Sequence, residues 1–584
     1  MIKKILTLEH LLYALIIIIG IAFRFISLGR LPLSDAEGVV SLHALGLLSR
    51  GTTVAYSDQT FLANLQAIFF FFFGNSNFSA RFFPALLGTL FILTPALFRS
   101  YFPSKAMIIL SFWIAISPTF IALSRQVNST LLFLLAIVLF IYFFIKRKTL
   151  PSAIFIIISL LSGKIFFWTL ITLLFTLIYV HLVVNKQNSP IYEKSIWFFK
   201  SFEWKKFWFA AMIGYVFLST MGFIFPDQFS GVGYGVNAYL NSWSHFSSLR
   251  LSDLVRGMLF YEIGVILFGI AGIIYIVRKN QLAGLFITGI LSFGFVQFVL
   301  ISEKSIIYLL IILLPLIIAA SFFINHFANF PKSFGPKILV VTSIALSILF
   351  FISLAFMSMF ANPYQGEQEN TLRIFFIIAG FALIIGAGLL AGWAISWQIA
   401  GKSFLFVALI FLSIINLSAA VNGSGLRNPY QNEILSISPI PIEQDLLIDT
   451  LEDYSEWNYG NHHTINVYVM GDQPASLFWA LREFDNITQG NEIPLNENID
   501  IIITNADQTL VQSDMFRGQD ILWTSYVWRA TRAAASCCAS RTPTASAPRP
   551  RPSRCSSTRC SGWAWSGTRS PSTSPRAWRR IGRR

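Results

Sequence analysis

The chain has 584 residues, of which 55% are hydrophobic and 12% charged, and its mean hydropathy of +0.64 excludes an ordinary soluble globular protein. The formal net charge of +15 is misleading, because residues 529–584 contain 13 arginines and no acidic residue. Without this tail, 30 basic residues (43 − 13) face 28 acidic ones, which leaves a net charge of +2. We therefore expect no nucleic-acid partner.

Apolar runs that are long enough, or nearly so, to cross a hydrocarbon core of ~30 Å recur along the chain. They lie at residues 11–23, 106–121, 131–145, 165–184, 263–277, 306–323, 338–360, 374–395 and 404–420. Together with shorter candidates, these runs predict about thirteen spans when basic loops are kept on one side. The predicted fold class is an all-α polytopic membrane protein with a small C-terminal α/β extracytoplasmic domain.

The distribution of basic residues predicts the orientation of the chain in the cell membrane. Lys3 and Lys4 precede the first apolar run, so the positive-inside rule places the N-terminus in the cytoplasm. Basic clusters then recur on the same side, at residues 99–105, 146–148, 186–206, 278–279, 332–337 and at Lys402. This pattern requires residues 152–163 to form a short span, and an odd number of spans places the C-terminal domain outside the cytoplasm.

Two predicted outer segments are too long to be simple connections. The loop at residues 28–77 contains AEGVVSLHALGLLSRG, a predicted helix, and FLANLQAIFFFFFG, which is too short to span and is expected at the membrane interface. Residues 422–528 follow the last span. There IEQDLLIDTLEDYSEW and PASLFWALREF predict helices, and INVYVM and IDIIIT predict strands.

We divide the chain into four parts. Residues 1–325 form a transmembrane module, 326–421 add further transmembrane helices, and 422–528 form the α/β domain. Residues 529–584 are a basic low-complexity tail that holds all four cysteines. Its abrupt change of composition indicates either a frameshift or joined fragment, or a disordered basic segment.

Five stretches within residues 1–325 carry a resemblance to known enzymes. They are RLPLSDAEGVV (30–40), FFGNSNFSARFFPALLGTL (72–90), ALSRQVNST (122–130), LLSGKIFF (160–167) and SEKSIIYLLIILLPL (302–316). In order and placement they resemble motifs of the GT-C membrane glycosyltransferases. The nearest group is the family-39-like enzymes, which include protein O-mannosyltransferases and the lipid A aminoarabinose transferase. The resemblance implies inverting transfer of a sugar from a polyprenyl-phosphate donor to an extracytoplasmic acceptor.

The resemblance assigns catalysis to Asp35 and Glu37. The family has adjacent acids, whereas this chain reads Asp35-Ala36-Glu37-Gly38, so Glu37 matches the second acid and Asp35 is the nearest substitute for the first. A carboxylate at the edge of the membrane is partly desolvated, which raises its pKa and makes it a better general base. We expect Asp35 to take the proton of the acceptor.

Four cations are candidates for holding the donor phosphate, because a charge near a span is costly and is often functional. They are Arg81, Arg125, Lys164 and Lys304. We expect Arg125, Lys304 and Asp35 to face one cavity; the alternative for each cation is extension of the side chain to the membrane surface. The residues expected to line the cavity are Asn128, which stands where the family has Asp, and Tyr261, Glu262 and Glu303.

No cofactor is assigned, although Asp35 and Glu37 are compatible with a divalent metal ion held through oxygen ligands. The expected partners are a polyprenyl-phosphate-linked sugar, membrane lipids and an acceptor that the sequence does not identify. Three alternatives stay open: a glycan polymerase or ligase, a transporter or flippase of lipid-linked glycans, and a catalytically inactive relative. Transport is disfavoured because the two halves show no internal repeat.

Overall fold

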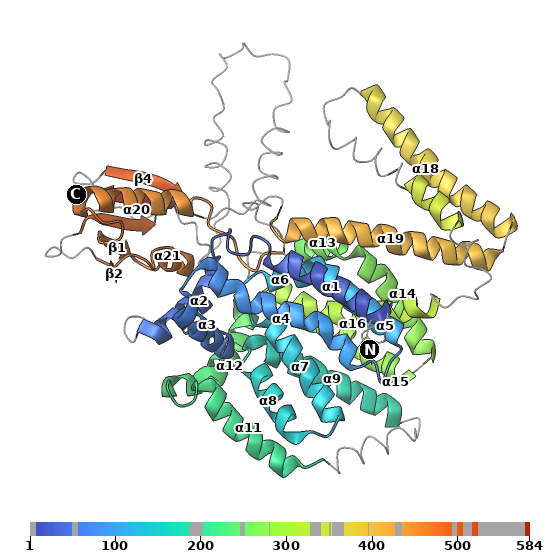
Figure 1. Ribbon diagram of the computed structural model, residues 1–584, viewed down its shortest axis with the longest axis horizontal. Coiled ribbons are helices and arrows are strands. Elements are labelled where there is room, and N and C mark those ends of the chain that lie inside the picture. Colours follow the sequence, from blue (N-terminus) through green and yellow to red (C-terminus); the bar gives the residue numbers. More distant parts are fainter. Residues whose placement is uncertain are drawn as a thin grey trace, which may run out of the picture.

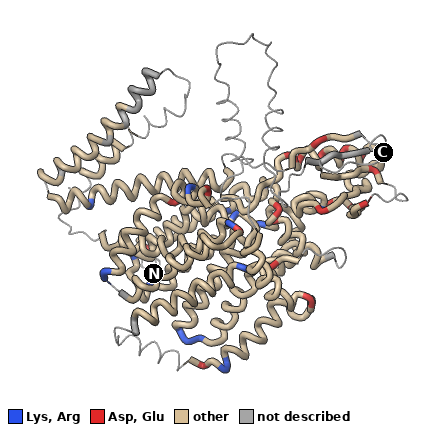
Figure 2. Tube along the Cα trace, turned by 180° about the vertical axis from the view of Figure 1, so that it is seen from behind, with Lys and Arg blue, Asp and Glu red and all other residues tan. Residues whose placement is uncertain are grey.

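The computed structural model describes residues 8–49, 56–185, 202–245, 251–279, 281–327, 340–349, 352, 367–394, 396–426, 435–492, 499–505, 517–523 and 578–583. The described chain consists of a large helical bundle and a smaller α/β domain beside it (Figure 1). Charged residues are sparse along the bundle, whereas acidic residues recur over the α/β domain (Figure 2).

The first half of the bundle begins with a long apolar helix, followed by two helices of the first loop and then by a series of closely spaced helices. Their bounds are α1 (Leu8–Phe25), α2 (Asp35–Ser49), α3 (Thr60–Phe73), α4 (Asn77–Leu97), α5 (Ser104–Ile116), α6 (Pro118–Ser124), α7 (Thr130–Ile145), α8 (Thr149–Leu160) and α9 (Lys164–Asn185). Both helices predicted in the loop at residues 28–77 are therefore present.

In the second half of the bundle, α14 and α15 pack against α16, most of whose residues are buried in the main hydrophobic core. The elements of this half are α11 (Trp204–Ser219), the 3-10 helix η2 (Pro226–Ser230), α12 (Gly231–Ser244), α13 (Leu251–Tyr261), α14 (Ile263–Lys279), α15 (Gln281–Leu300), α16 (Ile306–Phe327), α18 (Glu367–Ala394) and α19 (Trp397–Gly423).

Among the described residues, six helices are long and apolar enough to cross a membrane, or eight if each of two bent helix pairs is one span. Further apolar helices are shorter, including α3, α7 and α8. The multi-pass fold is thus confirmed, whereas the count of thirteen spans is not. Part of the predicted run at residues 338–360 lies outside the described residues.

The short segment at residues 152–163 is present as α8, which has 12 residues. At 1.5 Å per residue it is about 18 Å long, well under the ~30 Å of a hydrocarbon core. It nevertheless reverses the direction of the chain, because Ser129 Oγ, just before α7, donates a hydrogen bond of 2.6 Å to Ser162 O, just after α8. The chain therefore returns to the end of the bundle from which α7 starts.

The C-terminal domain contains α20 (Gln444–Tyr459), β1 (Asn466–Met470), α21 (Ala475–Ala480), β2 (Asn486–Gly490), β3 (Ile501–Asn505), β4 (Arg517–Leu522) and β5 (Trp578–Arg583). The strand order is β2-β1-β3-β5-β4, with β2, β1 and β3 parallel and β5 antiparallel to both neighbours. Both predicted helices and both predicted strands are present. Strand β2 has a mostly exposed polar sequence, NITQG, which gives no alternating apolar signal.

Strand β5 comes from the basic tail, and residues 524–577 lie outside the described part of the chain. On its bundle side, the domain packs against the first loop, where α21 lies beside α2 (Figure 1). Trp479 Nε1 donates to Asn77 Oδ1 at 2.8 Å, and Arg482 Nε donates to Asn75 O at 2.8 Å. The domain is thereby fixed against the start of α4.

Candidate active site

The carboxylate of Glu37 lies in the first turn of α2 and forms a buried ion pair with Arg81 of α4. Arg81 Nε and Nη2 each donate at 2.8 Å to a different oxygen of Glu37. The same carboxylate accepts from Ser34 N at 2.9 Å, Ser34 Oγ at 3.0 Å and Val127 N at 2.9 Å. Burial alone raises the pKa of Glu37, but Arg81 and these donors outweigh it and lower the pKa below its ordinary value.

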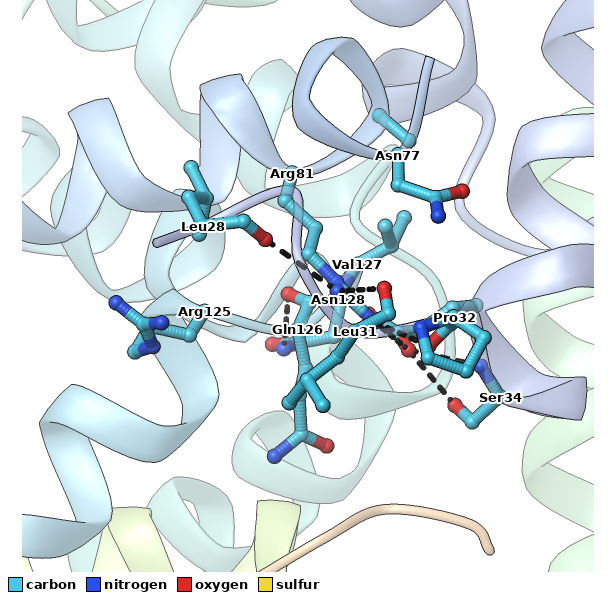
Figure 3. Close-up of polar contacts among 12 residues, drawn as sticks. Leu28, Leu31, Pro32, Ser34, Asn77, Arg81, Arg125, Gln126, Val127 and Asn128 are labelled. Atoms are coloured by element: carbon cyan, nitrogen blue, oxygen red, sulfur yellow. Dashed lines mark hydrogen bonds and ion pairs between the residues drawn. The ribbon is translucent and has the colours of Figure 1, made fainter. Parts of the chain in front are cut away.

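The hydrogen-bond donors of Arg81 are also fully used, and we call such a group saturated. Its remaining N–H groups donate to the carbonyls of Leu28, Leu31 and Pro32 at 3.4, 2.7 and 2.9 Å. A guanidinium has five N–H donors, and with the two bonds to Glu37 each of the five has an acceptor. Figure 3 shows this side chain pointing into the loop formed by Leu31 and Pro32. As arranged, Arg81 orders the first loop and has no donor left for a phosphate.

Arg125 has a similar structural role at the end of α1. Its guanidinium donates to carbonyls in and just beyond the last turn of that helix, those of Phe23, Arg24, Ile26 and Ser27, at 2.8–3.3 Å. Burial, together with the nearby Arg81, lowers the pKa of Arg125 to about 10. In Figure 3 its side chain points away from Arg81.

A pocket of about 50 Å³ lies between these residues and the linker to the C-terminal domain. Its lining includes Glu37, Arg81, Arg125 and Gln126 on one side and residues 422–425, 435, 436 and 440 on the other. At ~10–15 Å³ for each water, this volume holds only a few water molecules. Neither Asp35 nor Lys304 lines it, so the expectation that Arg125, Lys304 and Asp35 face one cavity does not match the structure.

Asn128 and its neighbours form the turn that joins α6 to α7. Its amide Nδ2 donates to Leu123 O at 2.7 Å and Gln126 O at 2.9 Å, and its Oδ1 accepts from Thr130 N at 3.1 Å. A carboxylate has no donor and would repel both carbonyls. This geometry explains why the chain has Asn where the resembling family has Asp: here the residue shapes the turn.

Glu262 and Arg24 stabilise a break between α5 and α6, which are bent by 59° at Ser117. Pro118 has no N–H, which frees carbonyls at the end of α5. Arg24 donates to two of them, Ile114 O at 3.3 Å and Ala115 O at 3.4 Å. Glu262, at the bend between α13 and α14, accepts from Ser117 Oγ at 2.5 Å and Thr119 N at 3.1 Å. Each charge thus lies at the helix end that favours it.

Lys304 and Glu303 are neighbours in the chain but have separate roles. Lys304 Nζ donates to the carbonyls of Phe298, Val299 and Ile301, and so caps the end of α15. Glu303 forms an ion pair of 2.5 Å with Lys164 Nζ at the start of α9. Of the four predicted cations, Lys164 is therefore the one that the structure brings to a partly exposed carboxylate, because 22% of its side chain and 28% of that of Glu303 are accessible.

Asp58, which the sequence did not single out, completes the group around Lys164. Its Oδ2 accepts from the backbone N of Lys164 at 3.1 Å, and Gly163, with φ of 84°, brings the chain against it. Burial raises the pKa of Asp58, an effect that Lys164 partly offsets. Tyr308, fully buried and stacked on Trp168, lies within electrostatic range of all three charges. We call Asp58, Lys164, Glu303 and Tyr308 the lysine cluster.

His43 links α2 to this cluster. Its Nδ1 accepts from Ser57 N at 3.3 Å and its Nε2 lies 2.8 Å from Gln228 Nε2. Burial lowers the pKa of His43 to about 4, so the ring is neutral at physiological pH.

The sequence contains only weak signals for the site residues that it did not predict. Asp58 and Ser57 lie in a short polar interruption between two apolar helices, and Arg24 is a single charge at the end of the first apolar run.

Asp35 lies at the first position of α2 but contacts the C-terminal domain, where its Oδ1 accepts from Ser476 N at 3.2 Å. Tyr261 is half-buried against the main core. Both oxygens of Glu37 accept from Arg81, and Oδ1 of Asp35 accepts from Ser476. Among the described residues, no three His, Cys, Asp or Glu side chains gather in a way that would hold a metal ion.

Comparison with solved structures identifies the architecture. The crystal structure of ArnT from Cupriavidus metallidurans bound to undecaprenyl phosphate aligns with a TM-score of 0.53 and 12% identity, over 87% of this chain and 95% of that chain. The chain has the GT-C fold. ArnT in the apo state aligns over the same shares with a TM-score of 0.51 and 12% identity. An Archaeoglobus fulgidus oligosaccharyltransferase is more distant, with a TM-score of 0.45 at 12% identity over 85% of this chain and 69% of that chain. No protein-family model and no curated protein matches the sequence.

Proposed function

We propose that this protein is a membrane glycosyltransferase that transfers a sugar from a polyprenyl-phosphate donor to an extracytoplasmic acceptor. The GT-C fold supports this proposal, as does the undecaprenyl phosphate bound to ArnT, which shares the fold. The observation that carries it is the lysine cluster, where a cation and two carboxylates gather at the junction of the first loop and α9.

In this proposal Lys164 binds the donor phosphate. An ammonium group has three N–H donors, and Glu303 accepts one of them. The side chain is 22% accessible, and we propose that the phosphate approaches it from this exposed side. A cation beside a phosphate in a partly dry site forms a strong, charge-assisted contact and stabilises the leaving group as the bond to the sugar breaks.

Asp35 is the proposed general base. The acceptor hydroxyl oxygen attacks C1 of the sugar, the bond between C1 and the phosphate oxygen breaks, and the hydroxyl proton passes to Asp35. Asp35 precedes His43 by eight residues on α2, about 12 Å along the helix axis, and His43 contacts the residue before Asp58. The base therefore lies at the start of α2, whereas His43, further along the same helix, contacts the residue before Asp58 of the lysine cluster. We place the donor sugar between the base and the cluster. Glu37, whose oxygens are saturated, holds the loop.

The test uses purified protein in lipid nanodiscs, radiolabelled polyprenyl-phosphate sugars and a membrane extract as the source of acceptor. We expect release of polyprenyl phosphate, and we expect Asp35→Asn to lower turnover at least ~100-fold, the scale of a lost general base. Asp472→Asn, which changes an exposed acid of the C-terminal domain in the same way, should retain wild-type turnover. If the wild-type protein showed no turnover with any donor, the result would favour a catalytically inactive relative. Full turnover in Asp35→Asn would show that Asp35 is not the general base.

The proposed orientation has a cytoplasmic N-terminus and an extracytoplasmic C-terminal domain. Asn461, exposed in that domain, and Lys148, exposed between α7 and α8, mark the two sides. With the four tail cysteines replaced, a cysteine at Asn461 should react with an impermeant maleimide on intact cells, and one at Lys148 should react only after permeabilisation. The reverse pattern would invert the predicted topology.

A further inference from the structure

The carboxylate of Asp35 is bound by a residue that lies 441 positions away in the sequence. Ser476, in the first turn of α21, donates its backbone N–H to Asp35 Oδ1 at 3.2 Å, and its hydroxyl donates to the same oxygen. Two donors from the C-terminal domain therefore converge on one oxygen of an acid that belongs to the transmembrane module.

A third residue fixes the direction of the hydroxyl. Trp523 Nε1 lies 2.8 Å from Ser476 Oγ, and both residues are fully buried. An indole N–H is a donor only, so Ser476 Oγ must accept this bond. The single hydroxyl proton of Ser476 is then left for Asp35. The hydrogen bonds thus run in one direction, from Trp523 through Ser476 to the carboxylate.

Close packing of the two helices holds this contact in place. A Cβ atom on Gly38 would lie 2.9 Å from the backbone carbon of Ala475, a distance that real Cβ atoms essentially never show. Glycine at this position therefore lets α2 and α21 approach backbone to backbone. The linker adds a further contact one residue from Asp35, where Ala36 N donates to Ser438 Oγ at 3.1 Å.

We propose that Ser476 is a positioning residue for Asp35, and that the C-terminal domain thereby completes the active site rather than serving as a separate binding module. This inference rests on the proposed function, in which Asp35 is the base. Ser476 selects the orientation of the carboxylate and stabilises its charged form, the form that accepts the proton of the acceptor. Trp523 acts through Ser476.

The test is the pH profile of kcat/KM for polyprenyl-phosphate release in nanodiscs, measured for the full chain carrying Ser476→Ala. A hydrogen bond to the charged form of an acid lowers its pKa. Losing the hydroxyl should therefore move the acid limb of the profile, where kcat/KM falls as the base becomes protonated, to higher pH. The expected movement is about 1–2 pH units, the scale of a hydrogen bond to a charged group. Ser438→Ala is the matched control, because it is the same substitution at the same interface without contact to the carboxylate. Its acid limb should not move.

Two further variants keep the proposal testable if Ser476→Ala is poorly folded. Trp523→Phe retains the hydroxyl but frees it to rotate, and should move the acid limb in the same direction by a smaller amount. Ser476→Thr retains the donor and should keep the wild-type limb. An unmoved limb in a folded Ser476→Ala or Trp523→Phe protein, or an equal movement in Ser438→Ala, overturns the positioning role while leaving the proposed function intact. Full turnover of Asp35→Asn overturns both.

Discussion

Two polar clusters include residues of the first loop, Glu37 in one and Asp58 in the other, and they differ in how many of their hydrogen-bonding groups already have partners. The pair of Glu37 and Arg81 is almost completely buried, and every N–H of the guanidinium has an acceptor. Lys164 and Glu303 are about one quarter accessible, and the ammonium has donors beyond its bond to Glu303. A saturated pair builds structure, whereas a partly exposed, unsaturated cation is free to bind a ligand.

One turn joins the two clusters. Val127 N donates to Glu37, and two residues later Ser129 N donates at 2.7 Å to Gln59 Oε1, next to Asp58. The turn at residues 125–130 therefore fixes the distance between the proposed base, at the start of α2, and the proposed phosphate site. In this arrangement the Glu37–Arg81 pair holds the proposed base and the proposed phosphate site in position and takes no part in the reaction.

The largest expected effect on stability comes from breaking the saturated pair. Glu37→Gln leaves the buried charge of Arg81 without its counter-charge, which typically costs about 3–5 kcal/mol. Glu303→Gln is the matched control, because it removes the same charge from a partly exposed pair and should cost only about 0–1 kcal/mol. Thermal unfolding in detergent measures both. Equal losses of unfolding free energy in the two variants would contradict the distinction between a buried structural pair and a partly exposed binding pair.

In contrast to Glu37→Gln, Lys164→Met should affect binding of the donor phosphate more than the stability of the fold. The loss of one charge-assisted contact should weaken binding of a polyprenyl-phosphate probe about 10- to 100-fold. Because the ion pair is partly exposed, the unfolding transition should change by less than about 1 kcal/mol. Lys148→Met, at the exposed turn between α7 and α8, should leave binding unchanged. Wild-type affinity in Lys164→Met would exclude the lysine cluster as the phosphate site.

Arg125→Ala tests whether a predicted phosphate ligand is instead a helix cap. Removing its guanidinium leaves several carbonyls at the end of α1 unpaired, with an expected loss of about 1–3 kcal/mol. Donor affinity should stay at the wild-type value. A folded protein of normal stability with weakened donor binding would return Arg125 to the list of phosphate ligands.

The smallest expected effect concerns His43, which connects the two clusters. Its folded pKa of about 4 lies below the ordinary value of 6.5, so the unfolded state binds more protons between these values and stability falls as pH decreases through this window. The expected loss between pH 6.5 and 5.5 is about 1 kcal/mol. His43→Gln should lack this component. An identical pH dependence of the melting temperature in wild type and variant would show that the ring is not buried neutral.

Local sequence determined the class of the protein and most of its elements. Long apolar runs predicted a multi-pass helical protein, and the apolar patterns of INVYVM and IDIIIT predicted β1 and β3. These signals are local, because hydropathy and the periodicity of a helix or strand depend on neighbouring residues. The charge pattern predicted a short span at residues 152–163; the structure has the helix α8 at Thr149–Leu160, which is shorter than a span requires.

Only the tertiary structure decided which charges are free to act. Arg81, Arg125 and Lys304 are alike in the sequence as cations at the ends of apolar runs, yet each is occupied by carbonyls that loops or helix ends leave unpaired. Buried backbone groups need hydrogen-bond partners, and the partner comes from whatever segment the fold brings close. Arg125 contacts residues about 100 positions away, and Asp35 meets Ser476 441 positions away. Such pairings depend on the packing of distant helices, which no local pattern encodes.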